Sequence, residues 1–323
     1  MDDHDHHAGQ PHDHGHSHSH CHGHGHGGHD HAPADFGAAF AIGVALNAGF
    51  VAAEVGFGLA AHATALLADA VHNTGDVLGL LLAWAAAVLA RRVPSLRRTY
   101  GWGRGSILAA LANAAVLLIG VGAIALAAVQ RLLHPAPVGA ETMLWVALAG
   151  IAVNGLTAWL FAGGSHDLNL RAVFVHMAGD VAVSSGVVVA ALLIGAFGAT
   201  WIDPAASLVI IAVIIAATWG VLRDAVNLAM DGVPAGIATN EVADYLRHLP
   251  GIVEVHDLHI WGLSTTETAL TAHLVHDGEP PPETLILEAT RELGARFAIG
   301  HATLQVETVQ LASVCRLRPA DVV

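Results

Sequence analysis

The chain has 323 residues, of which 54% are hydrophobic and only 12% are charged, so it predicts a membrane protein with a soluble portion. Its formal net charge of −14 argues against a nucleic-acid partner, because no basic surface is available to neutralise phosphates. The two cysteines, Cys21 and Cys315, lie near opposite ends and provide no disulfide framework. The N-terminus is acidic and rich in histidine, whereas a secretory signal begins with basic and then apolar residues.

Residues 1–35 form a low-complexity tail that holds 13 of the 24 histidines, alternating with Asp, Gly and Ser. The tail has almost nothing to bury, so we expect it to be disordered without metal. Closely spaced imidazoles chelate zinc, nickel or copper, which predicts a metal-capture arm in which no single histidine is essential. Deleting residues 2–31 is expected to lower apparent metal affinity more than maximal rate, and a complete loss of activity would contradict this.

Six apolar segments, each long enough to cross a bilayer, follow from Phe36 onward. They are rich in Gly and Ala, and small residues of this kind let membrane helices approach closely. These segments predict an all-α six-helix transmembrane bundle over residues 36–222. They cover residues 36–60, 64–90, 106–132, 142–163, 171–197 and 201–222.

The distribution of arginine predicts the orientation of the bundle, since the chain contains no lysine. The connection between the second and third segments, residues 91–104, is rich in arginine, whereas the connection after the third segment has only Arg131. The positive-inside rule therefore places residues 91–104 in the cytoplasm, and an even number of spans places both termini there. The Ala- and Arg-rich composition hints at a GC-rich bacterium and hence at a plasma membrane.

The second and fifth predicted spans carry the same pair of ionisable residues, His72 with Asp76 and His176 with Asp180. Residues four apart share one face of a helix, about one turn from each other. Each such side chain is costly in a bilayer, by roughly 2.5 to 3.5 kcal/mol at a helix centre. Two imidazoles and two carboxylates on facing helices suit tetrahedral zinc, whereas manganese and magnesium prefer all-oxygen ligands. The alternative is that the pairs serve only as hydrogen-bonding contacts between helices.

Further polar groups lie within the predicted spans. Asp69 shares the helix face of His72, where it either relays ions or protons to the site or caps a water-filled cavity. Glu54 is the first to test, because an unpaired carboxylate at that depth is expensive. The others are interpreted as groups that form hydrogen bonds between helices or line a cavity: Asn47, Asn113, Asn154 and Asp203.

A metal site inside the membrane also predicts a coupled transport cycle. Zinc binds neutral imidazole and ionised carboxylate, so metal binding expels protons and protonation expels metal. The reference pKa of histidine, about 6.5, allows this exchange close to neutral pH. Helices that rock between inward- and outward-open states would then give proton-driven antiport of Zn²⁺, with cobalt, cadmium or nickel as secondary ions.

After a linker at 223–236, residues 237–312 are charged and are expected to form a small cytoplasmic α+β domain. Short alternating runs bounded by turns predict strands, and periodic runs between them predict helices. The order α-β-β-α-β suits an open-faced sandwich of the metallochaperone-like kind, followed by a C-terminal tail at 313–323. Helices are expected at 239–249 and 283–297, and strands at 252–263, 267–276 and 301–310.

The stretch from Thr64 to Asp76 resembles the second transmembrane helix of cation diffusion facilitators of the zinc-transporter type. His176-Met177-Ala178-Gly179-Asp180, followed by Ser184-Ser185, is similar to the fifth helix of that family. The likeness extends over nearly everything from about residue 36 to residue 310. It includes Thr99–Arg104 with Ile107–Ala110 at the third helix, Trp201–Pro204 at the sixth, and Val255–Trp261 and Ala302–Glu307 in the soluble domain.

The resemblance implies a transporter rather than an enzyme: a homodimer, joined through its C-terminal domains, that exports Zn²⁺ in exchange for protons. It assigns His72, Asp76, His176 and Asp180 to the transport site, a combination that the family associates with preference for zinc over cadmium. Some members hold another metal in the loop between the second and third helices. Residues Arg91–Gly103 contain no His or Asp, so that site is not transferred.

The resemblance also implies that His256, His273 and Glu307 bind regulatory zinc near the dimer interface. Cys315, in the C-terminal tail, is a candidate fourth ligand. The alternative is that these are surface residues of a sheet, since other histidines lie close in sequence and cannot all be ligands: His259, His276 and His301.

Two rival functions stay open. An intramembrane metalloprotease also places metal ligands in helices, but that chemistry usually needs His-Glu-x-x-His, and no His-Glu dipeptide occurs in the chain. A membrane-anchored metal sensor or storage protein would suit the histidine-rich tail and the soluble domain, but not ligands at mid-membrane. Metal uptake into vesicles that collapses with the pH gradient would separate transport from storage.

Overall fold

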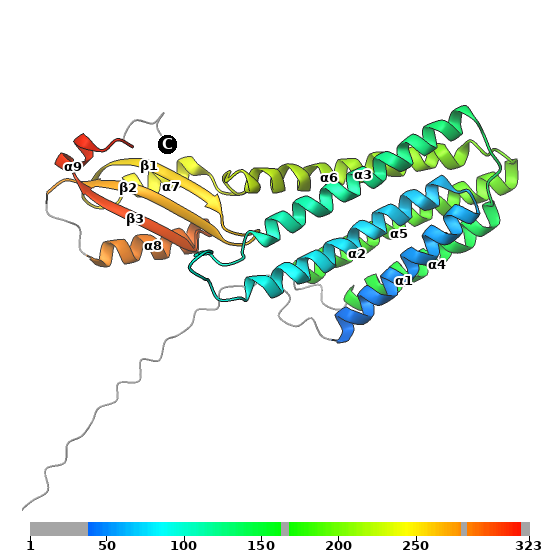
Figure 1. Ribbon diagram of the computed structural model, residues 1–323, viewed down its shortest axis with the longest axis horizontal. Helices are drawn as coiled ribbons and strands as arrows, with labels where there is room; N and C mark the ends of the chain where they lie inside the picture. Colours follow the sequence, from blue (N-terminus) through cyan, green and yellow to red (C-terminus); the bar gives the residue numbers. More distant parts are fainter. Residues whose placement is uncertain (1–37, 163–167, 279–282, 318–323) are drawn as a thin grey trace, which may run out of the picture. The chain divides into compact units, whose positions relative to one another are not determined.

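The computed structural model of the protein describes residues 38–162, 168–278 and 283–317, and within them six long helices precede a small mixed domain (Figure 1). The histidine-rich tail at 1–35 and the end of the C-terminal tail lie outside the described residues. The long helices are α1 (Ala38–Ala60), α2 (Thr64–Ala90), α3 (Gly105–Leu133), α4 (Ala140–Ala162), α5 (Leu168–Phe197) and α6 (Ile202–Ala229).

The helices have the apolar character that a bilayer requires. In the described part of the chain, α2, α3, α6 and residues Ala178–Phe197 of α5 are each long and apolar enough to cross a membrane. Shorter apolar stretches, Val44–Ala60 and Ala140–Leu156, belong to α1 and α4. The helical membrane bundle predicted from the sequence is confirmed.

The sixth helix is longer than the sequence analysis expected. It ends at Ala229 rather than at residue 222, so the first seven residues of the predicted linker are helical. Apolar residues continue at helical spacing beyond Arg223, and Ala225 is 4% exposed. Gly232 and Pro234 follow the end of the helix, which is consistent with a stop at this point.

α2 is the helix with the widest set of neighbours, since it contacts α1, α3, α5 and α6. Its close approach to α3 depends on glycine on both helices. A Cβ atom on Gly75 would lie 2.9 Å from Leu117, and one on Gly120 would lie 2.9 Å from Val71. Small residues at a crossing let two helix backbones approach closely. The helix that carries His72 and Asp76 is therefore held by packing on several sides.

Asp203 of α6 fixes the start of α2. Its Oδ2 accepts hydrogen bonds from the Thr64 backbone N–H at 2.8 Å and hydroxyl at 2.7 Å, and its Oδ1 accepts from the Ala65 N–H at 2.9 Å. Arg131 Nη1 lies 3.7 Å from the same carboxylate. A buried negative charge at a helix N-terminus satisfies unpaired N–H groups and complements the helix dipole. The interhelical hydrogen bonding expected for Asp203 is thus confirmed.

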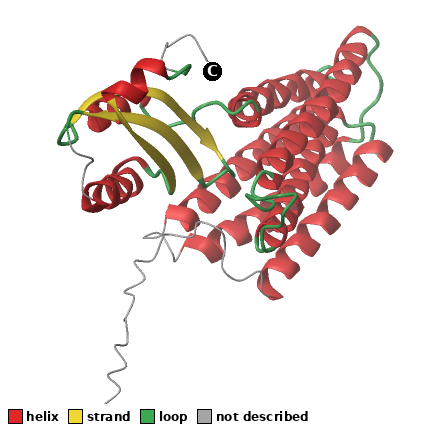
Figure 2. Ribbon diagram, turned by 60° about the vertical axis from the view of Figure 1, so that its left-hand side comes forward, coloured by secondary structure: helices red, strands yellow, loops and turns green. Residues whose placement is uncertain are grey.

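The C-terminal domain has a three-stranded sheet with strand order β1-β2-β3, where β1 is Ile252–Gly262, β2 is Thr268–His276 and β3 is His301–Thr308 (Figure 2). β1 and β2 are antiparallel, while β2 and β3 are parallel and joined through α8 (Glu283–Phe297). α8 and α7 (Thr239–Arg247) share an apolar core with the sheet that includes Leu246, Leu270 and Leu293. The predicted α-β-β-α-β order is confirmed.

One short helix follows the sheet that the sequence analysis did not include. The third strand ends at Thr308 rather than at residue 310, and the chain turns directly into α9 (Val309–Val314). The Thr308 hydroxyl accepts a hydrogen bond from the Leu311 N–H at 3.2 Å, so threonine acts as the N-cap of the new helix. α9 packs on β2 and β3, and Cys315 comes directly after it.

Candidate metal sites

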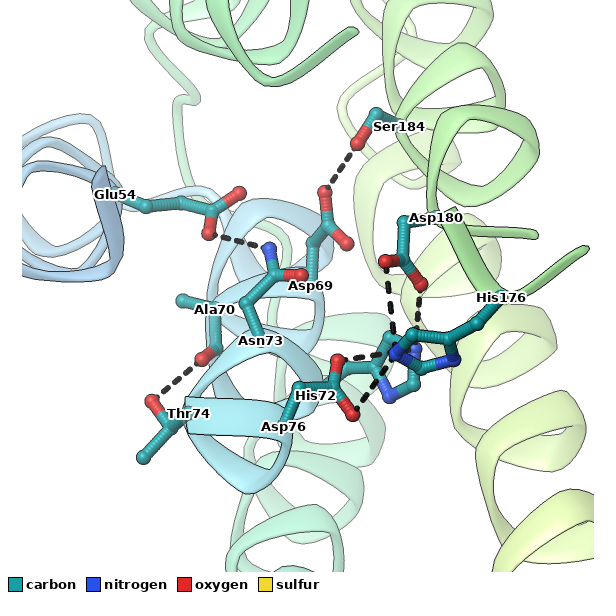
Figure 3. Close-up of polar contacts among 10 residues, drawn as sticks. All are labelled: Glu54, Asp69, Ala70, His72, Asn73, Thr74, Asp76, His176, Asp180 and Ser184. Atoms are coloured by element: carbon teal, nitrogen blue, oxygen red, sulfur yellow. Dashed lines mark hydrogen bonds and ion pairs between the residues drawn. The ribbon is translucent and has the colours of Figure 1, made fainter. Parts of the chain in front are cut away.

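α2 and α5 bring the two His-Asp pairs face to face, and His72, Asp76, His176 and Asp180 are called the membrane tetrad below (Figure 3). The shortest contacts join residues of different helices. His72 Nε2 lies 3.2 Å from Asp180 Oδ1, and His176 Nε2 lies 3.4 Å from Asp76 Oδ1. Within each helix the histidine nitrogen and the carboxylate oxygen are 3.8 Å apart. The structure therefore gathers all four predicted residues around one point between the helices.

The membrane tetrad is more open on one side than on the other. Ligand atoms of His72, Asp76 and Asp180 all lie within 4.8 Å of one another. His176 is outside this tighter group, with its ring centroid 6.1 Å from that of His72. The Asp180 side chain is 3% exposed, whereas that of His176 is 45% exposed. His72 Nδ1 and Asp76 Oδ2 are buried and lack hydrogen-bond partners in the described part, so they are free to bind an ion or a proton.

An apolar seal closes one end of the bundle next to the tetrad. On α2 its members, such as Leu66 and Ala68, precede His72, and on α5 its members, such as Val187 and Ile194, follow Asp180. Since the two helices run in opposite directions, both sets lie on the same side of the tetrad. Packed residues of α3, α4 and α6 complete the seal, including Leu117, Val121, Met143, Ala147, Ile210 and Ile214.

Two buried carboxyl groups and their hydrogen-bond donors lie next to the membrane tetrad, on the side of the apolar seal (Figure 3). Glu54 Oε2 accepts a hydrogen bond from Asn73 Nδ2 at 3.0 Å, and Asp69 Oδ2 accepts one from the Ser184 hydroxyl at 2.9 Å. The sequence analysis singled out the two carboxyls but missed both donors. A usable signal was present, since Asn73 follows Asp69 by four residues and Ser184 follows Asp180 by four residues.

The C-terminal domain holds another cluster, which combines His256, His273, Glu307 and Cys315 and is called the C-terminal tetrad below. One ligand atom from each lies within 4.8 Å of all the others. His256 and His273 are directly paired across β1 and β2, with ring centroids 5.1 Å apart. Glu307 Oε1 lies 3.0 Å from His273 Nδ1, and Cys315 Sγ lies 3.8 Å from the same nitrogen. The three predicted residues are brought together, and Cys315 joins them.

Burial makes this cluster hard to explain without a ligand. The side chains of His256, His273 and Glu307 are 5%, 13% and 1% exposed. Both ring nitrogens of His256 and the Oε2 atom of Glu307 are buried without a hydrogen-bond partner among the described residues. His256 Nε2 lies 3.5 Å from Glu307 Oε2 and His256 Nδ1 lies 3.6 Å from Glu254 Oε1, so these atoms have carboxylate–imidazole contacts but no hydrogen bond in the described part of the chain. Two imidazoles, a carboxylate and a thiol are ordinary zinc ligands, so the donor set fits such an ion.

Other histidines of the domain lie beside the C-terminal tetrad rather than in it. Asp257 links the two groups, because its Oδ2 lies 3.4 Å from His273 Nε2 and its Oδ1 lies 2.8 Å from His259 Nε2. A carboxylate on the far nitrogen of a ligating histidine orients the ring and raises its basicity. Asp257 is thus placed to position His273, and His259 to position Asp257.

With this geometry in view, the chain can be compared with known proteins. Residues 40–228 match the family described as the cation efflux transmembrane domain, and residues 234–309 match the cation efflux protein cytoplasmic domain. The chain belongs to the cation efflux family. It is therefore an integral membrane protein, as the apolar helices also indicate.

Cation efflux relatives match it over most of their length. The cadmium, cobalt and zinc/H(+)-K(+) antiporter of Bacillus velezensis is 32% identical over 286 residues, covering 87% of this chain and 91% of the relative. The zinc transporter ZitB of Escherichia coli is 34% identical over 283 residues, covering 86% and 90%. The solved metal-bound C-terminal domain of the CzcD transporter from Cupriavidus metallidurans shares 36% identity over 22% of this chain and 99% of that domain, with a TM-score of 0.21.

Proposed function

We propose that this cation efflux protein exports Zn²⁺ from the cytoplasm in exchange for protons, with the membrane tetrad as its transport site. The observation that carries the proposal is the cross-helix pairing, in which each histidine lies closer to the carboxylate of the other helix than to its own. A single divalent ion at that point would join α2 to α5. The names of relatives, a zinc transporter and a cadmium, cobalt and zinc/H(+)-K(+) antiporter, support both the cargo and the exchange.

The same side-chain contacts suit both ions of the exchange. Two imidazole nitrogens and two carboxylate oxygens can surround Zn²⁺ tetrahedrally. When the ion is absent, a protonated histidine can form an ion pair with the carboxylate that it faces, at the observed 3.2 and 3.4 Å. Zinc and protons therefore compete for one set of atoms, which is the requirement for antiport through a single site.

The orientation of the cycle follows from the arginine-rich connection between α2 and α3. If that connection lies in the cytoplasm, as the positive-inside rule requires, the apolar seal lies toward the outer face of the membrane. The half-exposed His176 then lies on the cytoplasmic side of the tetrad, in an inward-open conformation ready to take up zinc. Both termini would be cytoplasmic, and the relatives from Bacillus velezensis and Escherichia coli support a bacterial plasma membrane.

Transport by the purified protein in sealed vesicles with an imposed pH gradient tests the proposal. We expect zinc uptake that requires the gradient, that is weaker for cobalt, cadmium and nickel, and that Asp180→Asn abolishes. Ser185→Ala is the matched control, because among the described residues this α5 hydroxyl donates to the Val181 carbonyl of its own helix, at 2.6 Å, and to no other group. Zinc that is bound but never accumulates would instead indicate a membrane-anchored sensor or storage protein.

We also propose that the C-terminal tetrad holds a regulatory Zn²⁺ and that the protein works as a homodimer. The buried atoms of His256 and Glu307 that make no hydrogen bond among the described residues support the first part. The match of residues 234–309 to a cytoplasmic-domain family named for dimerisation supports the second. When bound, the ion would join β1, β2 and β3 to the residue that follows α9. Native mass spectrometry of the full chain with and without His256→Ala tests both parts, through the number of zinc ions and the number of subunits.

A further inference from the structure

Glu54 and Asp69 are two fully buried carboxyl groups that the proposed exchange at the membrane tetrad does not use. One oxygen of each accepts a hydrogen bond, from Asn73 and from Ser184 respectively. The other oxygens, Glu54 Oε1 and Asp69 Oδ1, are buried and receive no hydrogen bond within the described residues. Each carboxyl is an electrostatic neighbour of the other, in the arrangement that Figure 3 shows. Apart from a proton that one carboxyl could donate to the other, the two remaining oxygens have no hydrogen-bond donor among the described residues.

The basic side chains nearest to Glu54 and Asp69 form ion pairs with other carboxylates. No ion pair reaches either carboxyl in the described part of the chain, where Arg131 is paired with Asp203 and His72 with Asp180. The titratable groups that act on Asp69 from the helices around it are Glu54, His72 and Asp180. Two neighbouring carboxylates in a buried site cannot both be ionised, so they keep one proton between them.

We infer that Glu54, with Asp69 as its partner, is a proton-binding site that releases its proton when Zn²⁺ enters the membrane tetrad. The inference rests on the proposed function and adds a proton carrier to it. Asp69 precedes His72 by one turn of α2, so the two positive charges of the ion favour ionisation of both carboxyls. The O–H bond of Glu54 breaks, the proton passes to water, and two carboxylates remain. Departure of the ion reverses the step.

The hydrogen-bond donors connect this site to the helices that hold the metal. Asn73 directly follows His72, and Ser184 lies one turn beyond Asp180 on α5. Glu54, in contrast, belongs to α1, which also packs against α2. A displacement of α2 against α5 would therefore remove the donor of Asp69 at the moment the metal ligands separate, while the hydrogen bond from Asn73 to Glu54 joins α1 to α2. Ser184 is accordingly a positioning residue for Asp69.

Proton release on zinc binding tests the inference in the purified full-length protein. Zinc is added in weakly buffered detergent solution containing a pH-indicator dye, at one fixed starting pH for all variants, so that protons released by the histidines of the membrane tetrad are common to them. Protons are counted per protein chain at saturating zinc, so that release from the histidine-rich tail and the C-terminal tetrad is the same in every variant and cancels in the difference. We expect Glu54→Gln to release about one proton fewer than the wild type, since the pair holds one. The glutamine oxygen can still accept from Asn73.

Three further variants make the outcome decisive. Asp69→Asn should lose the same single proton, and the double variant should lose no more than either single variant, because the proton belongs to the pair. Asp224→Asn on α6 is the control: its carboxylate is exposed, lies 3.4 Å from Arg223 Nε and should leave the count unchanged. Unchanged release in both Glu54→Gln and Asp69→Asn, or a doubled loss in the double variant, would overturn the inference.

The same titrations separate this inference from the proposed function. If Asp180→Asn binds as much zinc as the wild type, the membrane tetrad is not the metal site and the proposed function fails. If Asp180→Asn binds less zinc while Glu54→Gln releases the full number of protons, only the role of Glu54 fails. Should Glu54→Gln fold poorly, Asp69→Asn on α2 tests the same loss of one released proton.

Discussion

The membrane tetrad and the C-terminal tetrad contain similar residues, but the protein supports them in different ways. In the membrane, the four side chains come from two helices that contact each other directly over only a short length, and His176 is nearly half exposed. In the C-terminal domain, three of the four come from adjacent strands and are almost fully buried. Metal sites that keep their ion are closed, whereas those that exchange ligands keep an open position. The first site is therefore suited to a passing ion and the second to a resident one.

The backbone explains why one site can move and the other cannot. Residues on α2 keep their spacing when the whole helix shifts, so the distance between the two His-Asp pairs can change without breaking a helical hydrogen bond. His256 and His273 are instead paired across a ladder of main-chain hydrogen bonds, and Glu307 lies beside Val275 on the next strand. Separating them would require breaking the sheet. The comparison predicts that ligand loss affects transport at the first site and affinity or regulation at the second.

The largest effect is expected for Asp180→Asn. Asp180 is the most buried member of the membrane tetrad and approaches both histidines, at 3.2 and 3.8 Å. Loss of a supporting group costs a metal site about 10- to 100-fold, and loss of a direct ligand should exceed that, so kcat/KM for zinc should fall by more than roughly 100-fold. Initial rates in vesicles with a fixed pH gradient measure it. A fall smaller than tenfold would place the ion elsewhere.

His256→Ala should lower the number of bound zinc ions and leave transport nearly unchanged. It removes a buried ligand of the C-terminal tetrad, so one zinc ion per chain should be lost, while transport at saturating zinc should stay within about threefold of the wild type because the membrane tetrad is intact. Equilibrium dialysis gives the zinc count, and the vesicle assay gives the rate. A loss of transport as large as that of Asp180→Asn would break the distinction between the two sites.

The sequence analysis could predict the membrane tetrad in more detail than the C-terminal tetrad, because its pattern is local. His72 and Asp76 lie on one helix face whatever surrounds them, and the repeat at His176 and Asp180 predicts a partner. The identity of the facing helix, and the shorter cross-helix contacts between α2 and α5, depend on the packing of the bundle and cannot be obtained from spacing. The resemblance to a family assigned both His-Asp pairs to one site in advance. The spacing of Asn73 and Ser184 was a usable signal that the sequence analysis missed, but the carboxyls to which they donate are known only from the fold.

For the C-terminal tetrad, the strands and the first two helices were predicted to within a few residues, and Cys315 was named as a candidate fourth ligand. The short helix that brings Cys315 to the cluster was missed. The expected strand through residue 310 would have carried the chain onward in an extended conformation. Instead, Thr308 caps α9, and the turn brings Cys315 within 3.8 Å of His273. A single hydroxyl that accepts one N–H competes with strand extension here, and periodicity alone gives no basis for choosing between them.

Cys315→Ser changes one atom of the C-terminal tetrad, from sulfur to oxygen. Sulfur is a better zinc ligand than a hydroxyl oxygen, so zinc affinity at the C-terminal tetrad should fall by about tenfold while binding persists through the other three ligands. The measurement is competition with a chromophoric chelator, using a chain that lacks residues 2–31 and carries Asp180→Asn. Unchanged affinity would mean that the thiol lies near the ion without binding it.

The smallest effect is expected for Asp257, which contacts His273 but does not belong to the C-terminal tetrad. Asp257→Asn keeps the shape of the side chain but weakens its interaction with His273 Nε2, now 3.4 Å away. Because such a carboxylate orients the imidazole and raises its basicity, zinc affinity should fall by about tenfold or less, in the same competition assay. His259→Ala is the control one step further out, since it contacts Asp257 at 2.8 Å and is absent from the tetrad. A larger effect from His259 than from Asp257 would mean that His259 itself binds the ion. The metal ligands of the C-terminal domain would then include His259, and they would differ from the set that the burial of His256 and Glu307 indicates.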